Sequence, residues 1–119
     1  MKNTCNVGVI AYTSSGSPFH FYIPVFDSFP KDIAFVFAHQ HFVVGAINDK
    51  VLLTLFCAND EGDKYYEQLD VTKACREDAP LRLCIVKTSE LCVLYAYSDS
   101  HHNGQFPLST TFKQKAGLL

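Results

Sequence analysis

Three histidines are the residues of this chain whose spacing could place them around a metal ion. His39 and His41 are two positions apart in an apolar stretch that is expected to be extended, and side chains two apart on a strand emerge from the same face. Two imidazoles in this geometry can bind one zinc ion, at nitrogen–zinc distances of about 2.0–2.1 Å. An antiparallel pairing of the segment before residue 27 with the segment after residue 32 would place His20 opposite His39. The pattern therefore predicts a three-histidine site for zinc or iron, and with it a small metal-dependent β-barrel enzyme.

Other features of the same segments favour packing over metal binding. Phe35 and Phe37 share the face of His39, and a shift of the pairing by one residue would move His20 to the opposite face. The main expectation is therefore a chain without a cofactor, and the zinc or iron site is the alternative. No catalytic residue is predicted, because the sequence contains neither a G-x-S-x-G elbow nor a G-x-x-x-x-G-K-[ST] phosphate-binding loop.

The cysteines predict a reducing compartment. There are five of them and none forms a CxxC pair, so they fit neither a complete set of disulfides nor a zinc ribbon. Cys57, Cys84 and Cys92 fall within apolar runs and are expected to be buried thiols with a structural role. The first residues, Met1 to Cys5, lack the apolar stretch of an intact signal peptide. A cytoplasmic location is therefore expected.

Length and composition indicate one globular domain over residues 1–119. A hydrophobic share of 48% with a net charge of −2 is typical of a folded domain. The same charge argues against a nucleic-acid partner, because few cations are available to neutralise phosphates. No apolar run approaches the roughly 20 residues of a membrane-spanning helix. Residues 99–119 are expected to form a less ordered C-terminal segment.

Short apolar runs, separated by Gly, Pro, Asn, Asp and Ser, predict a mainly β fold. The expected strands are 5–13, 18–26, 33–47, 51–58, 81–88, 90–98 and 106–112. Pro18 and Pro24 cannot donate ladder hydrogen bonds, which predicts an edge strand over 18–26. The run 33–47 is apolar on both faces, as in a strand that is covered on both sides.

Turn residues complete this prediction. Asn48–Asp49 and Thr88–Ser89 are expected to close two hairpins. A single helix is expected over residues 64–76, because Asp63 can cap it and Pro80 lies just beyond its end. The predicted fold is an antiparallel sandwich or small barrel of about seven strands with one short helix.

The opening residues resemble a known class of domain. Residues 6–12 (NVGVIAY), the Ser/Gly turn after them and residues 18–22 (PFHFY) are similar to the first hairpin of longin or roadblock-type trafficking domains. That resemblance implies an α+β fold, in which a long helix follows the hairpin, and a role as an adaptor in membrane traffic. Because the run 33–47 has the pattern of a strand, the α+β fold is the alternative.

Tyrosines on the expected strand faces suggest an interaction surface. The chain has six Tyr and ten Phe, which is more aromatic area than one small core needs. Tyr22, Tyr95 and Tyr97 combine a large contact area with a polar hydroxyl group, as interface residues do. The leading prediction is a non-catalytic interaction module that acts through an aromatic surface or a sheet edge. Its partner would be another protein or a second copy of the chain.

Overall fold

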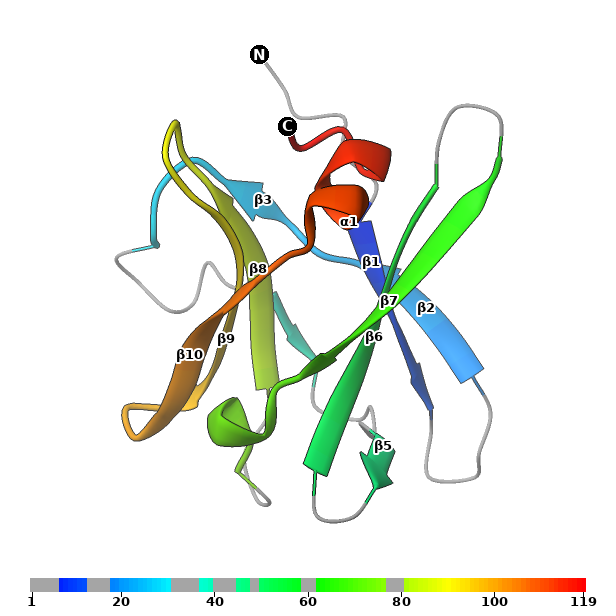
Figure 1. Cartoon of the computed structure of the whole chain (residues 1–119). Coiled ribbons are helices and arrows are strands. Elements are labelled where there is room, and N and C mark those ends of the chain that lie inside the picture. Colours follow the sequence, from blue (N-terminus) through cyan, green and yellow to red (C-terminus); the bar gives the residue numbers. More distant parts are fainter. Residues whose placement is uncertain are drawn as a thin grey trace.

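Two β-sheets pack face to face in the computed structural model of the chain (Figure 1). The structure describes residues 7–12, 18–30, 37–39, 45–47, 50–58, 62–76 and 81–119. Within these ranges the chain forms strands, one short α-helix and a 3₁₀ turn. The predicted mainly β sandwich with one short helix is confirmed, whereas the α+β alternative is not what the structure shows. No helix in the described ranges is long and apolar enough to cross a bilayer.

Sheet A is built around strand β6. Its strands are β1 (Val7–Tyr12), β2 (Pro18–Tyr22), β5 (Gly45–Ile47), β6 (Lys50–Ala58) and β7 (Lys64–Asp70). β1 and β7 flank β6 on opposite sides, because Cys57 pairs with both Val7 and Tyr65. β2 pairs with the other side of β1, so β2 is an end of sheet A among the described strands, as are β7 and the short β5, which both pair with β6. The edge position predicted from Pro18 is therefore confirmed for β2.

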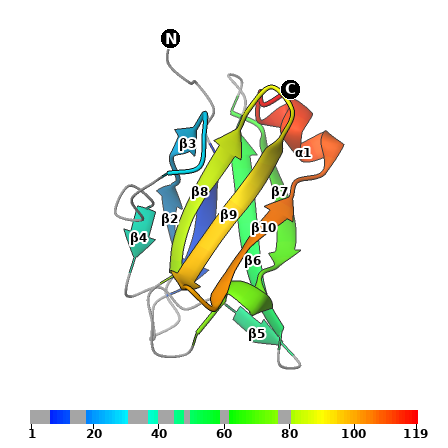
Figure 2. The same ribbon diagram turned by 90° about the vertical axis from the view of Figure 1, so that its left-hand side faces the viewer.

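Sheet B is built around strand β8. Its strands are β3 (Val25–Phe26), β4 (Phe37–His39), β8 (Leu81–Lys87), β9 (Cys92–Asp99) and β10 (His102–Pro107). β9 and β10 follow β8 as an antiparallel meander, while β3 and β4 lie along the other edge of β8 (Figure 2). The predicted β8–β9 hairpin is confirmed: Lys87 pairs with Cys92, and the Thr88 amide donates to the Leu91 carbonyl at 2.7 Å.

The chain crosses from sheet A to sheet B between Ile23 and Pro24. The Ile23 amide donates to the Val7 carbonyl in sheet A at 3.0 Å, whereas the Pro24 carbonyl accepts from the Ile85 amide in sheet B at 2.9 Å. The single strand predicted over residues 18–26 is therefore wrong. Its alternating pattern is real, but β2 and β3 belong to different sheets.

The long strand predicted over residues 33–47 is also divided between the sheets. β4 pairs with β8 in sheet B, and β5 pairs with β6 in sheet A, so no single strand can span both. Both pieces come from an apolar run, which explains why the division leaves no mark in the hydrophobic pattern. The hairpin predicted around Asn48–Asp49 agrees with the pairing of Ile47 with Lys50.

The helix predicted over residues 64–76 is wrong, because this segment forms β7 and a 3₁₀ turn (Thr72–Ala74). Exposed and half-buried residues alternate along β7, and Tyr65 and Leu69 pack against the core. All seven residues of β7 pair with β6. These tertiary contacts outweigh the weak helical signals of the segment.

The core lies between the inner faces of the two sheets. Its largest fully buried residues include Leu53, Leu55, Leu83, Ile85, Leu94 and Phe112. Phe112 belongs to helix α1 (Thr110–Lys115), whereas the sequence predicts a strand over residues 106–112. β10 ends at Pro107, and the Ser109 side chain caps the helix by accepting a hydrogen bond from the Phe112 amide at 3.0 Å.

Helix α1 is held to sheet A through Glu67 of β7. The Ser109 hydroxyl donates to the Glu67 carboxylate at 2.6 Å, and the Ser109 amide donates to its second oxygen at 3.4 Å. A carboxylate is favourable at this position, because the amides at the N-terminus of a helix carry partial positive charge. Ser109 therefore both caps α1 and anchors it to β7.

Replacing Ser109 should show how much this anchor contributes to stability. We expect Ser109→Ala to lower the free energy of unfolding by about 1–2 kcal/mol, because it removes a helix cap and a bond to a carboxylate. Urea denaturation followed by circular dichroism measures this loss. Thr111→Ala, at an exposed position of the same helix, is the control and should change stability little. Equal effects of the two substitutions would contradict the anchoring role.

Candidate binding surface

A row of aromatic residues crosses the outer face of sheet A. Tyr22 of β2 and Phe56 of β6 both pair with Gly8 of β1, and Phe56 also pairs with Tyr66 of β7. These four residues, one from each of four adjacent strands, are called the aromatic row. The ring centroid of Phe56 lies 5.6 Å from that of Tyr22 and 6.5 Å from that of Tyr66.

The two tyrosines are exposed, while the phenylalanine between them is buried. Phe56 is 2% exposed, whereas Tyr22 is 60% and Tyr66 50% exposed. Gly8 makes this arrangement possible, because it places no side chain between the rings of Tyr22 and Phe56. The row thus has an apolar centre with an amphipathic ring on either side.

Polar groups lie next to the aromatic row on the same face. Thr54 lies two positions before Phe56 on β6, and it pairs with Gln68, which lies two positions after Tyr66 on β7. The Gln68 amide group donates to the Thr54 hydroxyl at 3.5 Å. Gln68 is exposed and Thr54 is half-buried. A partner lying on the row could therefore contact both ring surfaces and an amide–hydroxyl pair.

Sequence reasoning finds Tyr22 but misses Gly8, Phe56 and Tyr66. The signal for Phe56 and Tyr66 is present in the alternation of their strands. Leu53, Leu55 and Cys57 of β6 face the core, so Phe56 must lie on the outer face. The erroneous helix over residues 64–76 hides the corresponding pattern for Tyr66.

Tyr95 and Tyr97 lie on the outer face of sheet B, on the opposite side of the sandwich from Tyr22. Their ring centroids are 6.3 Å apart, and Phe29 meets Tyr95 edge to face at 5.4 Å. Both tyrosines are half-buried, and Tyr95 packs against a small cluster around Cys84 and its neighbours on β8 and β9. The structure thus separates the three tyrosines predicted for interaction into two surfaces, and a binding role for Tyr95 and Tyr97 stays a prediction.

The strand pairing on which the three-histidine site depends is not found. His20 lies in β2 of sheet A, where it pairs with Ile10, and His39 lies in β4 of sheet B, where it pairs with Leu81. His41 is outside the described residues. Among the residues that the structure describes, no three His, Cys, Asp or Glu form a group that could hold a metal. The zinc or iron site therefore stays a prediction, but the described strands do not have the pairing of His20 with His39 on which it depends.

A different histidine takes part in a charged cluster at the end of β9. Asp99 accepts from the Arg76 guanidinium at 2.8 Å and lies 2.9 Å from Nδ1 of His102. The amides of His101 and His102 both donate to the same carboxylate at 2.8 Å. Arg76 first, and then His102, lower the pKa of Asp99 well below its ordinary value. The cluster joins the segment after the 3₁₀ turn to the β9–β10 connection.

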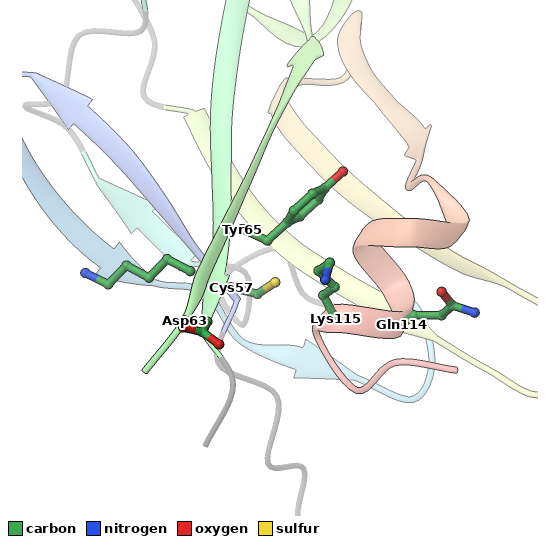
Figure 3. Close-up of a pocket in the computed structure, with 6 residues that line it drawn as sticks. Cys57, Asp63, Tyr65, Gln114 and Lys115 are labelled. Atoms are coloured by element: carbon green, nitrogen blue, oxygen red, sulfur yellow. The ribbon is translucent and has the colours of Figure 1, made fainter. Parts of the chain in front are cut away.

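A cavity of about 350 Å³ opens at one end of the sandwich, between β7 and α1 (Figure 3). Cys57, Tyr65 and Lys115 are among its lining residues, and the Lys115 ammonium lies 5.8 Å from the centre of the Tyr65 ring. Burial raises the pKa of the Cys57 thiol, and the nearby Lys115 opposes that shift without cancelling it. Its thiolate is therefore scarce at neutral pH, so Cys57 is a poor nucleophile.

The other described cysteines are also protonated at neutral pH. Burial raises the pKa of Cys75 to about 11 and that of Cys84 to about 12, and it raises the pKa of Cys92 as well. Cys57, Cys75, Cys84 and Cys92 are free thiols. The expected structural role of Cys57, Cys84 and Cys92 agrees with their positions in the strands.

Comparison with known proteins adds no relative: the chain matches no family model, no curated protein and no solved structure.

The lowered pKa of Asp99 predicts how the cluster contributes to stability as the pH changes. A carboxylate whose pKa is lowered by folding stabilises the protein above its ordinary pKa of about 4, and this contribution is lost as the pH falls toward the pKa of the folded state. Asp99→Asn should therefore reduce stability most near pH 7, and the difference from wild type should narrow between about pH 4 and about pH 2. Urea denaturation at a series of pH values measures it.

Glu90→Gln provides the matched control, because it also removes one carboxylate, from the exposed β8–β9 turn. It should change stability little at any pH. A constant difference between wild type and Asp99→Asn across this range would show that charge does not carry the effect.

Proposed function

We propose that this domain is a non-catalytic interaction module that binds a partner protein through the aromatic row of sheet A. The observation that carries the proposal is the ring contact of the buried Phe56 with two half-exposed tyrosines on the outer face of sheet A. Interfaces concentrate binding energy in such aromatic anchors, which are already packed before the partner arrives.

The size of the row indicates that it supplies only part of the contact with the partner. A tyrosine side chain can bury about 150–250 Å², so two half-exposed tyrosines offer far less than the roughly 800 Å² per partner of a standard interface. The row therefore acts as the centre of a larger contact. We expect the partner to place an apolar side chain between the tyrosines and polar groups near Thr54 and Gln68.

The four free thiols of the described residues support a reducing compartment for this interaction, because disulfides form and persist in oxidising ones. We therefore propose that the domain meets its partner in the cytoplasm. This location is part of the proposal and rests on the chemistry of the cysteines.

The aromatic row can be tested with peptides selected on the wild-type protein from a random phage-displayed library. We expect resynthesised peptides to bind Tyr22→Ala and Tyr66→Ala at least tenfold more weakly, since loss of an interface anchor costs more than about 1 kcal/mol. Isothermal titration calorimetry gives the affinities. The thermal midpoint of each variant should fall by only a few degrees, because at least half of each tyrosine is already exposed to solvent.

Tyr97→Ala is the matched control, because it removes the same ring from the opposite face of the sandwich. Peptides that bind this variant normally support the aromatic row. Peptides that lose affinity for Tyr97→Ala and keep it for Tyr22→Ala would place the binding surface on sheet B and contradict the proposal.

A further inference from the structure

Arg82 of β8 is a cation on the outer face of sheet B that has no counter-charge among the described residues. The chain contains two arginines, and the other, Arg76, forms an ion pair with Asp99. Arg82 is half-buried, and the ion pairs and hydrogen bonds of the described residues do not include it. Charged side chains are seldom taken out of water without a partner. An arginine can, however, bury its stem and keep its guanidinium hydrated, so the groups beside Arg82 decide what this charge can do.

Two tyrosines lie beside Arg82 on the same face. Arg82 pairs with Tyr97 of β9, and Cys84, the next outward residue of β8, pairs with Tyr95. Residues that pair across antiparallel strands have Cβ atoms about 4.5–5.5 Å apart, so the guanidinium of Arg82 and the phenol of Tyr97 can reach one ligand. The Tyr97 ring centre lies 6.3 Å from that of Tyr95, which Phe29 meets edge to face. A cation and a hydroxyl group thus adjoin a packed aromatic surface.

The ligand that suits Arg82 and Tyr97 is a hydrogen-bond acceptor with a single negative charge. A guanidinium has only donors, and a phenol hydroxyl can donate as well. A carboxylate accepts two parallel hydrogen bonds from one guanidinium. A phosphate group carries nearly two charges at neutral pH and is bound by clusters of cations, whereas the outward residues of β8, β9 and β10 contain no second lysine or arginine. The charge on this face therefore matches one carboxylate.

Asp99 lies on the same face but does not supply this carboxylate. It is the next outward residue of β9 after Tyr97, and it accepts a hydrogen bond from Arg76 at 2.8 Å. Two backbone amides of the β9–β10 connection also donate to it at 2.8 Å. These donors hold Asp99 at the end of β9, and they offset the charge that would otherwise repel an approaching anion.

We propose that the outer face of sheet B is a second interface for a partner protein, in which Arg82 and Tyr97 bind the carboxylate of an aspartate or glutamate. Charge complementarity selects this occupant, and arginine and tyrosine are typical anchors of protein interfaces. Free small molecules are normally bound in concave sites, but the cavity described above lies elsewhere, between β7 and α1. This favours a carboxylate that is carried by a protein surface.

The second interface is separate from the aromatic row. Figure 2 looks onto the outer face of β8, β9 and β10, whereas Tyr22 and Tyr66 lie on the outer face of sheet A. A domain with both surfaces can hold two partners at once, one on each side of the sandwich. A short acidic peptide makes only the central contact, so we expect it to bind in the millimolar range. Such binding is too weak to survive the washing of a phage selection, so the tests of the two faces give separate answers.

Nuclear magnetic resonance titration of the ¹⁵N-labelled protein with two blocked tripeptides tests the proposed contact. The acidic probe is acetyl-Phe-Glu-Phe-amide, and acetyl-Phe-Gln-Phe-amide is its neutral counterpart. We expect the acidic peptide to shift the amide signals of β8 and β9 around Arg82 and Tyr97, and the neutral peptide to bind at least fivefold more weakly. Arg82→Gln should abolish this preference. Tyr97→Phe, which keeps the ring and loses the hydroxyl, should reduce it.

Lys87→Gln is the matched control, because it removes the same charge from the other end of β8. It should leave the preference for the acidic peptide unchanged, as should Tyr22→Ala on the other sheet. The thermal midpoint of Arg82→Gln should stay within a few degrees of wild type, since no described partner loses a contact. If Arg82→Gln fails to fold, Arg82→Lys replaces it: the charge remains but the planar fork is lost, and the preference should fall.

Three results would overturn the proposal. The first is equal binding of the acidic and neutral peptides to the wild-type protein. The second is a preference for the acidic peptide that survives both Arg82→Gln and Tyr97→Phe. The third is a titration in which inorganic phosphate shifts the same signals at lower concentration than the acidic peptide, because the site would then select phosphate over a carboxylate.

Discussion

The burial of one side of strand β6 determines most of what sheet A presents to solvent. Leu53, Leu55 and Cys57 face the second sheet, so the intervening residues must face outward. Phe56 is one of them, and leaving its ring in water would forgo about 1.5–3 kcal/mol of hydrophobic stabilisation. Tyr22 and Tyr66 cover it from either side and keep their own outer surfaces exposed. The aromatic row is thus a consequence of the core, since the inward residues of β6 fix the outward position of Phe56.

Polar contacts close the side of the sandwich on which β7 and β10 form the sheet ends. The Ser98 hydroxyl donates to the Ala74 carbonyl at 2.6 Å, which joins β9 to the 3₁₀ turn. The Arg76–Asp99 ion pair joins the segment after the 3₁₀ turn to the end of β9. Glu67 of β7 is bound to Ser109 at the start of helix α1. These contacts link elements far apart in sequence without covering the outer face of β7. These contacts therefore hold the two sheets together on this side of the sandwich.

The local part of the fold follows from the sequence, and the long-range part does not. The hairpins β5–β6 and β8–β9 are predictable because alternation and turn residues are adjacent along the chain. The error over residues 64–76 has a specific cause: Glu67 occupies an inward position of β7, where a charged residue breaks the expected alternation. Its partner, Ser109, lies 42 residues further along the chain, so no local pattern can account for it. The crossing at Ile23–Pro24 is hidden for a related reason, since an extended segment can keep its alternation while its hydrogen-bonding partners change from one sheet to the other.

The candidate site is harder to predict than the strands, because it is assembled from one residue on each of four strands. Tyr22, Tyr95 and Tyr97 look equivalent in sequence, as each is a tyrosine on an alternating strand. They differ in what packs beside them: Tyr95 contacts Phe29 and the cluster around Cys84, whereas Tyr22 contacts the buried Phe56 across a glycine. The histidines also show that spacing along the chain does not determine which strands pair. The alignment of His20 with His39 assumes a pairing of two strands that in fact lie in different sheets. Chemistry that needs only neighbours along one strand can be inferred from spacing, but a surface that spans several strands depends on the order in which those strands pair.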